Sequence, residues 1–269
     1  MYVDVGTNRG VQLRKLFEPE LYPRAPVVRI FDRLFGRARA TDRSLCAFGF
    51  EPNPPLEGRL VALEQAYAKR GWSLRIFTRT AASTRDGDIA FHYYDDLDLN
   101  VGSSIRPRPN RSRAEVGDGR QLRTTVRSID LARFLVEHVH ARRIPFGATS
   151  TVVVKLDVEG HEYVLLPHLI ASGALCRVNL LFYEFHSGTR FVKNETDRAA
   201  KQDAEATMLR QIDGPKHLWG LRGCVTRATP MDDETYQRDD GQWRMPPVKQ
   251  QLADKALRRP PPPLTPIPW

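Results

Sequence analysis

The first ten residues contain the feature that most constrains the fold, a short apolar strand followed by a Gly-x-x-x-Gly turn. Val3 and Val5 suit a buried parallel strand, and Asp4 lies near its end. Gly6 and Gly10 lack Cβ atoms, which suits a tight turn and a close approach of the backbone to a ligand. A helix after the turn would direct its first N–H groups at that ligand. An ordinary strand-to-helix corner has the same pattern, so both interpretations remain open.

Two later apolar runs also end in acidic residues. Residues 45–51 end at Glu51 before a Pro-Asn-Pro-Pro sequence, and the β-branched run 151–157 ends at Asp157. The second run predicts the central strand of a parallel sheet. In a doubly wound sheet, ligands bind outside the carboxyl ends of the strands. We therefore expect Asp4, Glu51 and Asp157 to converge at one edge.

Hydrophobic periodicity predicts the other elements. We expect helices over 11–17, 27–35, 56–70, 131–139, 158–170 and 197–212, and strands over 72–77, 89–93, 178–185 and 223–229. Two segments lack this periodicity: residues 80–83, a run of small residues, and residues 100–127, which are polar and rich in Gly and Arg. We predict loops at both places. The first loop would let a flat ring approach closely at Ala81.

A basic insertion at about residues 18–44 separates the first helix from the second strand. Val27, Phe31 and Phe35 recur there at helical spacing, among several arginines. The insertion is either a lid or substrate-binding element, or a surface helix packed on the domain.

Together these patterns predict an α/β fold with a doubly wound, mostly parallel sheet. With 269 residues, 41% of them hydrophobic, the chain has enough for one sizeable core. We place one domain over residues 1–245, including the helical insertion. Residues 246–269 are rich in proline, and we expect them to form a disordered, extended tail.

The formal net charge of +9 suits nucleic-acid binding. Only eight of the 41 basic residues are lysines, and the arginines are scattered along the whole chain, which indicates a compositional bias instead. The three cysteines lie far apart, and we expect no metal site. No apolar run approaches the roughly 20 residues of a membrane-spanning helix. With no signal peptide visible, we expect a cytoplasmic protein.

The glycine pattern also bears on the cofactor. A turn that binds a diphosphate has a glycine two residues after the first, where this chain has Asn8. A side chain at that place leaves less room for a diphosphate, so the pattern favours S-adenosylmethionine over a nicotinamide dinucleotide. Glu51, at the end of the second strand, is expected to bind the ribose hydroxyls. The insertion explains why Glu51 comes more than the usual ~20 residues after the glycines.

Several motifs occur in an order that is specific to one family. They are Asp4-Val5-Gly6-Thr7-Asn8-Arg9-Gly10, Phe50-Glu51-Pro52-Asn53, Asn100-Val101-Gly102-Ser103-Ser104, the segment 126–135 with Ser-Ile-Asp at its centre, Lys155-Leu156-Asp157-Val158-Glu159-Gly160-His161-Glu162, and Glu184-Phe185-His186. In this order they resemble the motifs of the FkbM-type methyltransferase family. The resemblance covers about residues 2–186.

The resemblance implies a class I methyltransferase (Rossmann-like) fold, S-adenosylmethionine as cofactor, and O-methylation of a hydroxyl on a glycan, sugar or small metabolite. Methyltransferase sheets generally carry a helix upstream of the first strand, so we expect a segment before Met1, with any targeting signal on it. The residues expected to bind the cofactor are Asp4, Gly6, Asn8, Gly10, Glu51, Asn53 and Ala81.

Three residues after the central strand are candidates for the general base that takes the proton of the acceptor hydroxyl: Asp157, Glu159 and His161. Each also has a structural interpretation. Asp157 would orient the cofactor or cap the next helix. Glu159 would interact favourably with the dipole of that helix at its first turn. His161 would be a packing residue.

Two other functions remain as alternatives. A nucleic-acid methyltransferase predicts a contiguous basic groove leading to the pocket. A non-catalytic binding module that retains the fold predicts an empty or blocked pocket beside Gly6 and Gly10.

Overall fold

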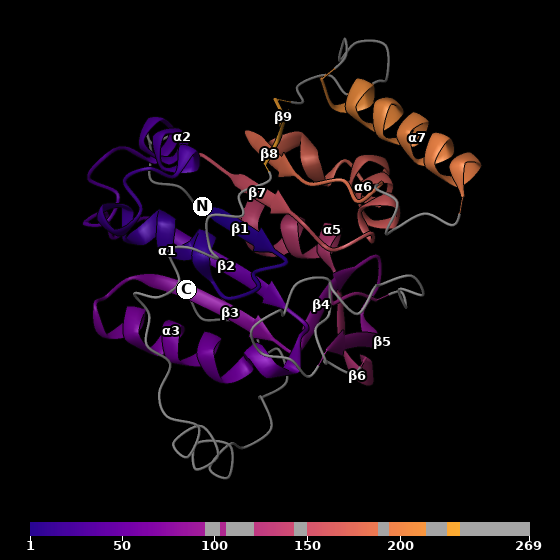
Figure 1. Cartoon of the computed structure of the whole chain (residues 1–269). Coiled ribbons are helices and arrows are strands. Elements are labelled where there is room, and N and C mark those ends of the chain that lie inside the picture. The colour runs from indigo at the N-terminus through magenta and orange to yellow at the C-terminus, as the bar shows by residue number, and fades with distance from the viewer. Residues whose placement is uncertain (95–102, 106–120, 143–149, 188–193, 214–224, 232–269) are drawn as a thin grey trace.

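Six parallel strands form the main sheet in the computed structural model, which describes residues 1–94, 103–105, 121–142, 150–187, 194–213 and 225–231 (Figure 1). From edge to edge they are β3 (Ser73–Thr78), β2 (Cys46–Glu51), β1 (Tyr2–Val5), β7 (Val153–Leu156), β8 (Leu180–Tyr183) and β9 (Arg227–Pro230). All neighbouring pairs are parallel. The order reverses between β1 and β7, which confirms the predicted doubly wound, Rossmann-like sheet.

Helices cover both faces of this sheet (Figure 1). Those on one face are α1 (Val11–Phe17), α2 (Pro26–Phe35) and α3 (Glu57–Lys69). Those on the other are α5 (Leu131–Phe134), α6 (Glu162–Ala171) and α7 (Glu195–Asp213). Three 3₁₀ turns span Pro19–Leu21, Pro54–Leu56 and Ala174–Arg177, and a π-helix extends α5 over Leu135–His140.

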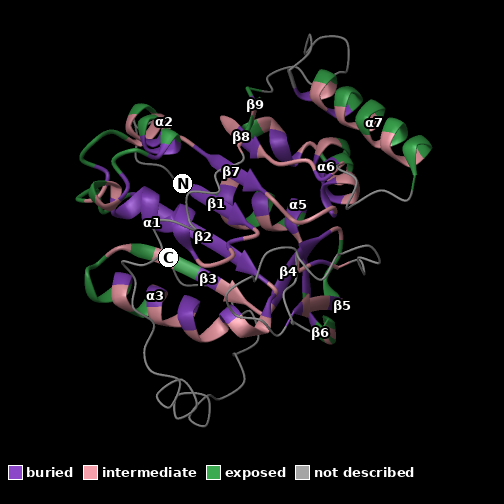
Figure 2. Ribbon diagram, in the orientation of Figure 1, coloured by how far each residue is buried: buried purple, intermediate pink, exposed green. Residues whose placement is uncertain are grey.

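The core has two halves because side chains alternate along a strand. In β1, Val3 and Val5 pack with α5 and α6, whereas Tyr2 packs with α1 and α2. The edge strands β3 and β9 are partly exposed, whereas β1, β2 and β7 are buried along their whole length (Figure 2). The continuous apolar runs that predicted these strands are therefore accounted for by burial on both faces.

A second, smaller sheet lies beside the carboxyl end of β2 and β3. It consists of β4 (Thr80–Ser83), β6 (Gln121–Asp130) and β5 (Gly87–Tyr94), with β6 in the middle. The loop prediction is therefore wrong for residues 80–83 and for 121–127. Exposed and partly buried side chains alternate along the first half of β6, and most of them are polar, so hydrophobicity does not mark this strand. The small residues of β4 are buried. The rest of the predicted loop, apart from residues 103–105, lies outside the described residues.

The insertion packs against the main sheet near the amino-terminal end of β1. Phe31 of α2 contacts the Tyr2 ring edge to face, with centroids 5.2 Å apart. Arg39 is buried, donates to the Leu16 carbonyl oxygen and pairs with Asp32. α1 starts at the carboxyl ends of the strands and runs back along the sheet, so the segment after α1 begins near the amino ends of the strands, away from the carboxyl ends. The structure thus favours the interpretation of α2 as a packed surface helix.

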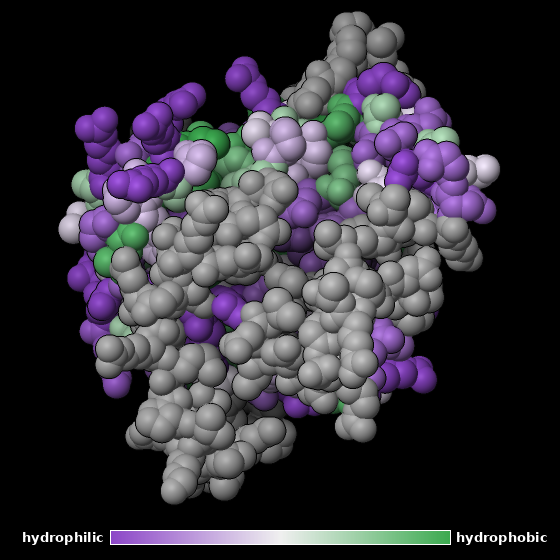
Figure 3. Space-filling model, viewed as in Figure 1, coloured by the Kyte–Doolittle hydropathy of each residue, from purple (hydrophilic) through white to green (hydrophobic). Residues whose placement is uncertain are grey.

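Hydrophilic side chains cover the outer sides of α2 and α7 (Figure 3). Among the described residues, no helix combines the length and the apolar character needed to cross a membrane. The proline-rich tail predicted for residues 246–269 lies outside the described residues.

Candidate functional site

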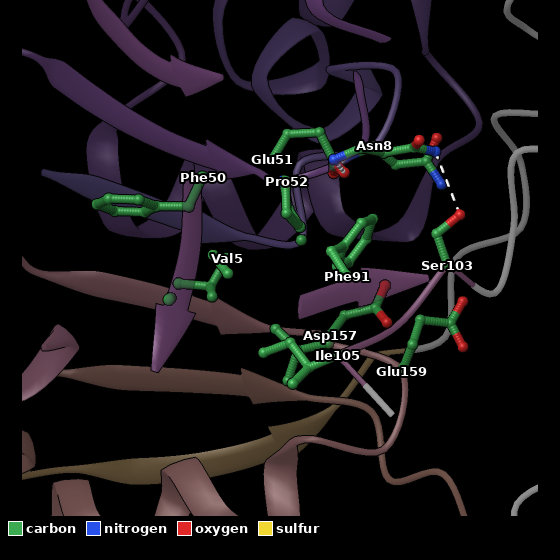
Figure 4. A pocket seen from close by; sticks show the side chains of 15 residues that line it. Val5, Asn8, Phe50, Glu51, Pro52, Phe91, Ser103, Ile105, Asp157 and Glu159 are labelled. Carbon is green, nitrogen blue, oxygen red and sulfur yellow. Dashed lines mark hydrogen bonds between the residues drawn. The ribbon is translucent and has the colours of Figure 1, made fainter. Parts of the chain in front are cut away.

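A pocket with about 570 Å³ of empty space, part of it open to solvent, lies at the carboxyl ends of β1, β2 and β7. The described residues that line it are Val5, Gly6, Asn8, Phe50, Glu51, Pro52, Asn53, Ala81, Ala82, Phe91, Ser103, Ile105, Asp157, Val158 and Glu159. Glu51 and Asn8 lie on one side, and Asp157 and Glu159 on the other (Figure 4). The expected convergence of the three strand ends is thus present, although Asp4 is buried behind the pocket wall.

The two glycines of the opening turn are required by packing inside the protein. Gly6 has φ +83°, and a Cβ on it would lie 1.7 Å from the carbonyl oxygen of Asp157. A Cβ on Gly10 would lie 2.6 Å from Cδ2 of Leu63 in α3. Gly6 therefore lets the turn close against the end of β7, and Gly10 lets α1 start against α3. Of the two, only Gly6 lines the pocket among the described residues.

Glu51 connects the glycine turn to the end of β2. Its Oε2 accepts a hydrogen bond from the Asn8 N–H at 2.6 Å, and its Oε1 accepts one from the Asn53 N–H at 2.9 Å. Burial raises the pKa of Glu51 to about 7, although both amides act to lower it. Because each carboxylate oxygen has two lone pairs, Glu51 can accept further donors from a ligand in the pocket.

Asn8 itself has φ +49°, in the left-handed region that glycine usually occupies. Its side chain lines the pocket beside Glu51. The position thus combines a turn geometry typical of glycine with a polar side chain, as the sequence pattern anticipated.

Lys155 is a buried residue of the site that sequence reasoning missed. Its Nζ lies 2.9 Å from Oδ2 of Asp157, 3.9 Å from Oδ1 of Asp4 and 3.4 Å from the Gly6 carbonyl oxygen. Burial lowers the pKa of Lys155, but Asp157 and Asp4 outweigh burial and raise it. Side chains two residues apart on a strand point to the same face, so the sequence could have predicted that Lys155 lies beside Asp157.

Asp4 lies deepest in this group. Burial raises its pKa to about 7, against the opposing charge of Lys155. Asp4 therefore lies behind the pocket wall, where its charge acts on Lys155 and on the lining acids Glu51 and Asp157.

His186, at the end of β8, was also missed as a site residue. Its Nδ1 lies 2.9 Å from Oε1 of Glu162, and its Nε2 lies 3.2 Å from Oε2 of Glu159, 3.4 Å from Oε1 of Glu184 and 3.8 Å from Oδ1 of Asp157. Burial lowers the pKa of His186, but the hydrogen bond and charge of Glu162, with Glu159 and Asp157, outweigh burial and raise it to about 9. Sequence spacing gives no sign of this cluster, because its members follow two different strands.

His161 takes a different position from the other two candidate bases. It is buried, its Nε2 lies 3.1 Å from Oγ of Ser83 in β4, and it is absent from the described lining of the pocket. Glu159 has φ +57° and lines the pocket. The positions favour Asp157 and Glu159 as site residues and His161 as a packing residue.

Residues 103–105 close one side of the pocket. Asn53 donates from Nδ2 to Oγ of Ser103 at 3.2 Å (Figure 4), and Oγ of Ser104 donates to the Glu159 carbonyl oxygen at 2.9 Å. The segment thus links the β2 side of the pocket to the β7 side. Ala81 and Ala82 of β4 add small side chains to the same wall.

One comparison with known proteins agrees with this fold. The family model described as the methyltransferase FkbM domain matches residues 4–210, which is most of the chain. No curated protein and no solved structure matches the chain. The matched residues run from Asp4 within β1 through β8 and include both sides of the pocket, whereas β9 lies beyond them. The chain therefore belongs to the FkbM methyltransferase family.

Proposed function

We propose that this methyltransferase transfers the methyl group of S-adenosylmethionine to a hydroxyl group on a glycan, sugar or small metabolite. One observation carries the proposal: a ribose-type acceptor, Glu51, faces two carboxylates, Asp157 and Glu159, across a single pocket. An acid at the end of the second strand suits ribose hydroxyls, and acids at the end of the central strand suit an acceptor hydroxyl.

The residues fit this cofactor on two counts. Glu51 is already held by the Asn8 and Asn53 amides and has lone pairs to spare for hydroxyl donors. Asn8 places a side chain where a diphosphate would need space, and Ala81 leaves room for a flat ring. Bound there, the cofactor supplies an electrophilic methyl group on a sulfonium.

The chain's own contribution is positioning and proton transfer. Lys155, 2.9 Å from Asp157, favours the ionised form of that carboxylate and fixes its direction. An ionised Asp157 or Glu159 can accept a hydrogen bond from the acceptor hydroxyl and take its proton as the new C–O bond forms. Holding the nucleophile at near-attack distance contributes most of the rate in such a displacement.

The alternatives receive less support. A nucleic-acid methyltransferase predicts basic side chains leading into the pocket, whereas the charged residues among its described lining are Glu51, Asp157 and Glu159. A non-catalytic module predicts an empty or blocked pocket beside Gly6 and Gly10, and the pocket that Gly6 lines is open to solvent, which speaks against the blocked form.

The test of the proposal is transfer of isotope-labelled methyl from S-adenosylmethionine to a panel of glycans, sugars and hydroxylated metabolites. We expect a labelled methyl ether with at least one acceptor. Transfer to nucleic acid alone, or to a nitrogen of every accepted substrate, would contradict the proposal.

A further inference from the structure

The cluster around His186 brings one imidazole nitrogen close to carboxylates from three positions in the chain. From Nε2 the oxygens lie at 3.2 Å for Glu159, 3.4 Å for Glu184 and 3.8 Å for Asp157. In an octahedral site with metal–oxygen distances of about 2.1 Å, adjacent ligand atoms are about 3 Å apart and opposite ones about 4.2 Å. The three separations are in the range that one coordination sphere spans.

The orientation of the ring is set on its other side by Glu162. Glu162 is fully buried, lies 2.9 Å from Nδ1 of His186, and accepts from the N–H groups of Val158 and Gly160 at 2.8 Å each. A hydrogen bond from Nδ1–H to a buried carboxylate is the usual support for a histidine that binds a metal through Nε2. It directs Nε2 towards the three carboxylates, whose charge is balanced there either by a proton on Nε2 or by a bound metal ion.

The cluster is also rich in negative charge. It contains four acids, Asp157, Glu159, Glu162 and Glu184, and the neighbouring cation Lys155 is shared between Asp157 and Asp4. The side chains of Asp157, Glu159 and Glu184 are 26%, 23% and 28% exposed, so an ion can enter from the pocket, whereas His186 is only 7% exposed.

We propose that this cluster is a binding site for a divalent metal ion of the Mg²⁺ or Mn²⁺ class, with His186 Nε2, Asp157, Glu159 and Glu184 as ligands and Glu162 as the support of the histidine. Carboxylate oxygens with one imidazole suit these ions. The proposal differs from the expectation of no metal site, which rested on cysteine spacing. Among the described residues, two of the proposed ligands, Asp157 and His186, group with the supporting Glu162, with possible ligand atoms within 4.8 Å of one another.

The role of the ion rests on the proposed function, although its binding does not. Two of the ligands, Asp157 and Glu159, line the pocket. An ion held by them would present open coordination positions to the acceptor, bind the acceptor hydroxyl and make its proton easier to remove.

The test is calorimetric titration of the metal-stripped full-length protein with MnCl₂, supported by the electron paramagnetic resonance signal of free Mn²⁺. We expect one ion per chain, with affinity at least about tenfold weaker in Glu184→Gln and in His186→Ala. Glu195→Gln is the matched control, since the Glu195 side chain is 81% exposed and lies at the start of α7. The melting temperature of each variant shows whether it is folded, and Glu184→Gln keeps the shape of a partly exposed side chain if His186→Ala does not fold.

Wild-type protein that binds no more Mn²⁺ than buffer does, or binding that folded Glu184→Gln leaves unchanged, would overturn the metal site. A parallel titration with S-adenosylhomocysteine separates this failure from that of the proposed function. Cofactor-product binding without Mn²⁺ binding removes only the metal site. Mn²⁺ binding without S-adenosylhomocysteine binding removes only the cofactor proposal.

Discussion

The Nζ atom of Lys155 lies 2.9 Å from Oδ2 of Asp157, and the same buried ammonium lies 3.9 Å from Oδ1 of Asp4. The Lys155 ammonium thus lies between a buried carboxylate of β1, that of Asp4, and a carboxylate that lines the pocket, that of Asp157. The contact makes the direction of Asp157 depend on a residue that a ligand does not touch.

Replacing Lys155 with methionine should destabilise the fold, because Asp4 would remain buried without its cation. Breaking a buried pair costs about 3–5 kcal/mol, and Asp4 can relieve part of this by taking a proton, since burial already raises its pKa to about 7 against the charge of Lys155. Urea unfolding at pH 8 and pH 6 measures the effect. We expect a larger loss at pH 8, and a partial recovery at pH 8 in Lys155→Met/Asp4→Asn. Equal losses at both pH values would show that Asp4 does not depend on Lys155.

Gly6→Ala should damage the fold as well as the pocket. The new Cβ would lie 1.7 Å from the Asp157 carbonyl oxygen, at a residue with φ +83°. Left-handed strain of about 1–2 kcal/mol and overpacking of about 1–3 kcal/mol together predict a loss of about 3 kcal/mol in the free energy of unfolding.

Gly173→Ala is the matched control for that strain. Gly173 has φ +71°, and nothing lies within 4 Å of the position of its Cβ, so only the left-handed strain should appear. Equal destabilisation by the two substitutions would mean that the contact between the turn and β7 contributes nothing.

Glu51 should make the stability of the ligand-free protein depend on pH. Its pKa is raised from 4.5 to about 7 by burial, so between these values the folded protein holds a proton that the unfolded chain has released. The contribution of Glu51 is therefore greatest below pH 4.5 and is lost as the pH rises towards about 7. In Glu51→Gln this part of the loss should vanish. A wild-type and a variant with parallel stability profiles between pH 4.5 and pH 8 would remove Glu51 as the cause.

Asp157→Asn should lower turnover by about 10²–10⁴-fold while cofactor affinity changes little, because the amide keeps the shape but loses the basicity. Single-turnover rates at saturating S-adenosylmethionine measure this, once an acceptor is known. Glu195→Gln, on exposed α7, is the control for a change of charge alone. Loss of cofactor binding with normal turnover at saturation would place Asp157 with the cofactor and leave Glu159 to be tested as the base.

The centre of the main sheet could be predicted from the sequence because β1, β2 and β7 are apolar runs that end at, or next to, a glycine or an acid. The small sheet could not be predicted, because most residues of β6 are polar and β4 consists only of small residues, so neither strand has a clear hydrophobic pattern. Lys155 was within reach, since it lies two residues before Asp157 on the same strand face. His186 and Glu184 were harder to find, because their partners Glu159 and Glu162 come more than twenty residues earlier and only the pairing of β7 with β8 brings them together.

The central claim is that the pocket beside Glu51 binds the cofactor, and titration calorimetry with S-adenosylhomocysteine tests it most directly. We predict one molecule bound per chain at pH 8, with affinity weakened by roughly 1–3 kcal/mol in Glu51→Gln through the loss of charge-assisted hydrogen bonds to ribose. Both proteins should have the same circular dichroism spectrum. No binding by the folded wild-type protein, or equal affinity in Glu51→Gln, would contradict the account.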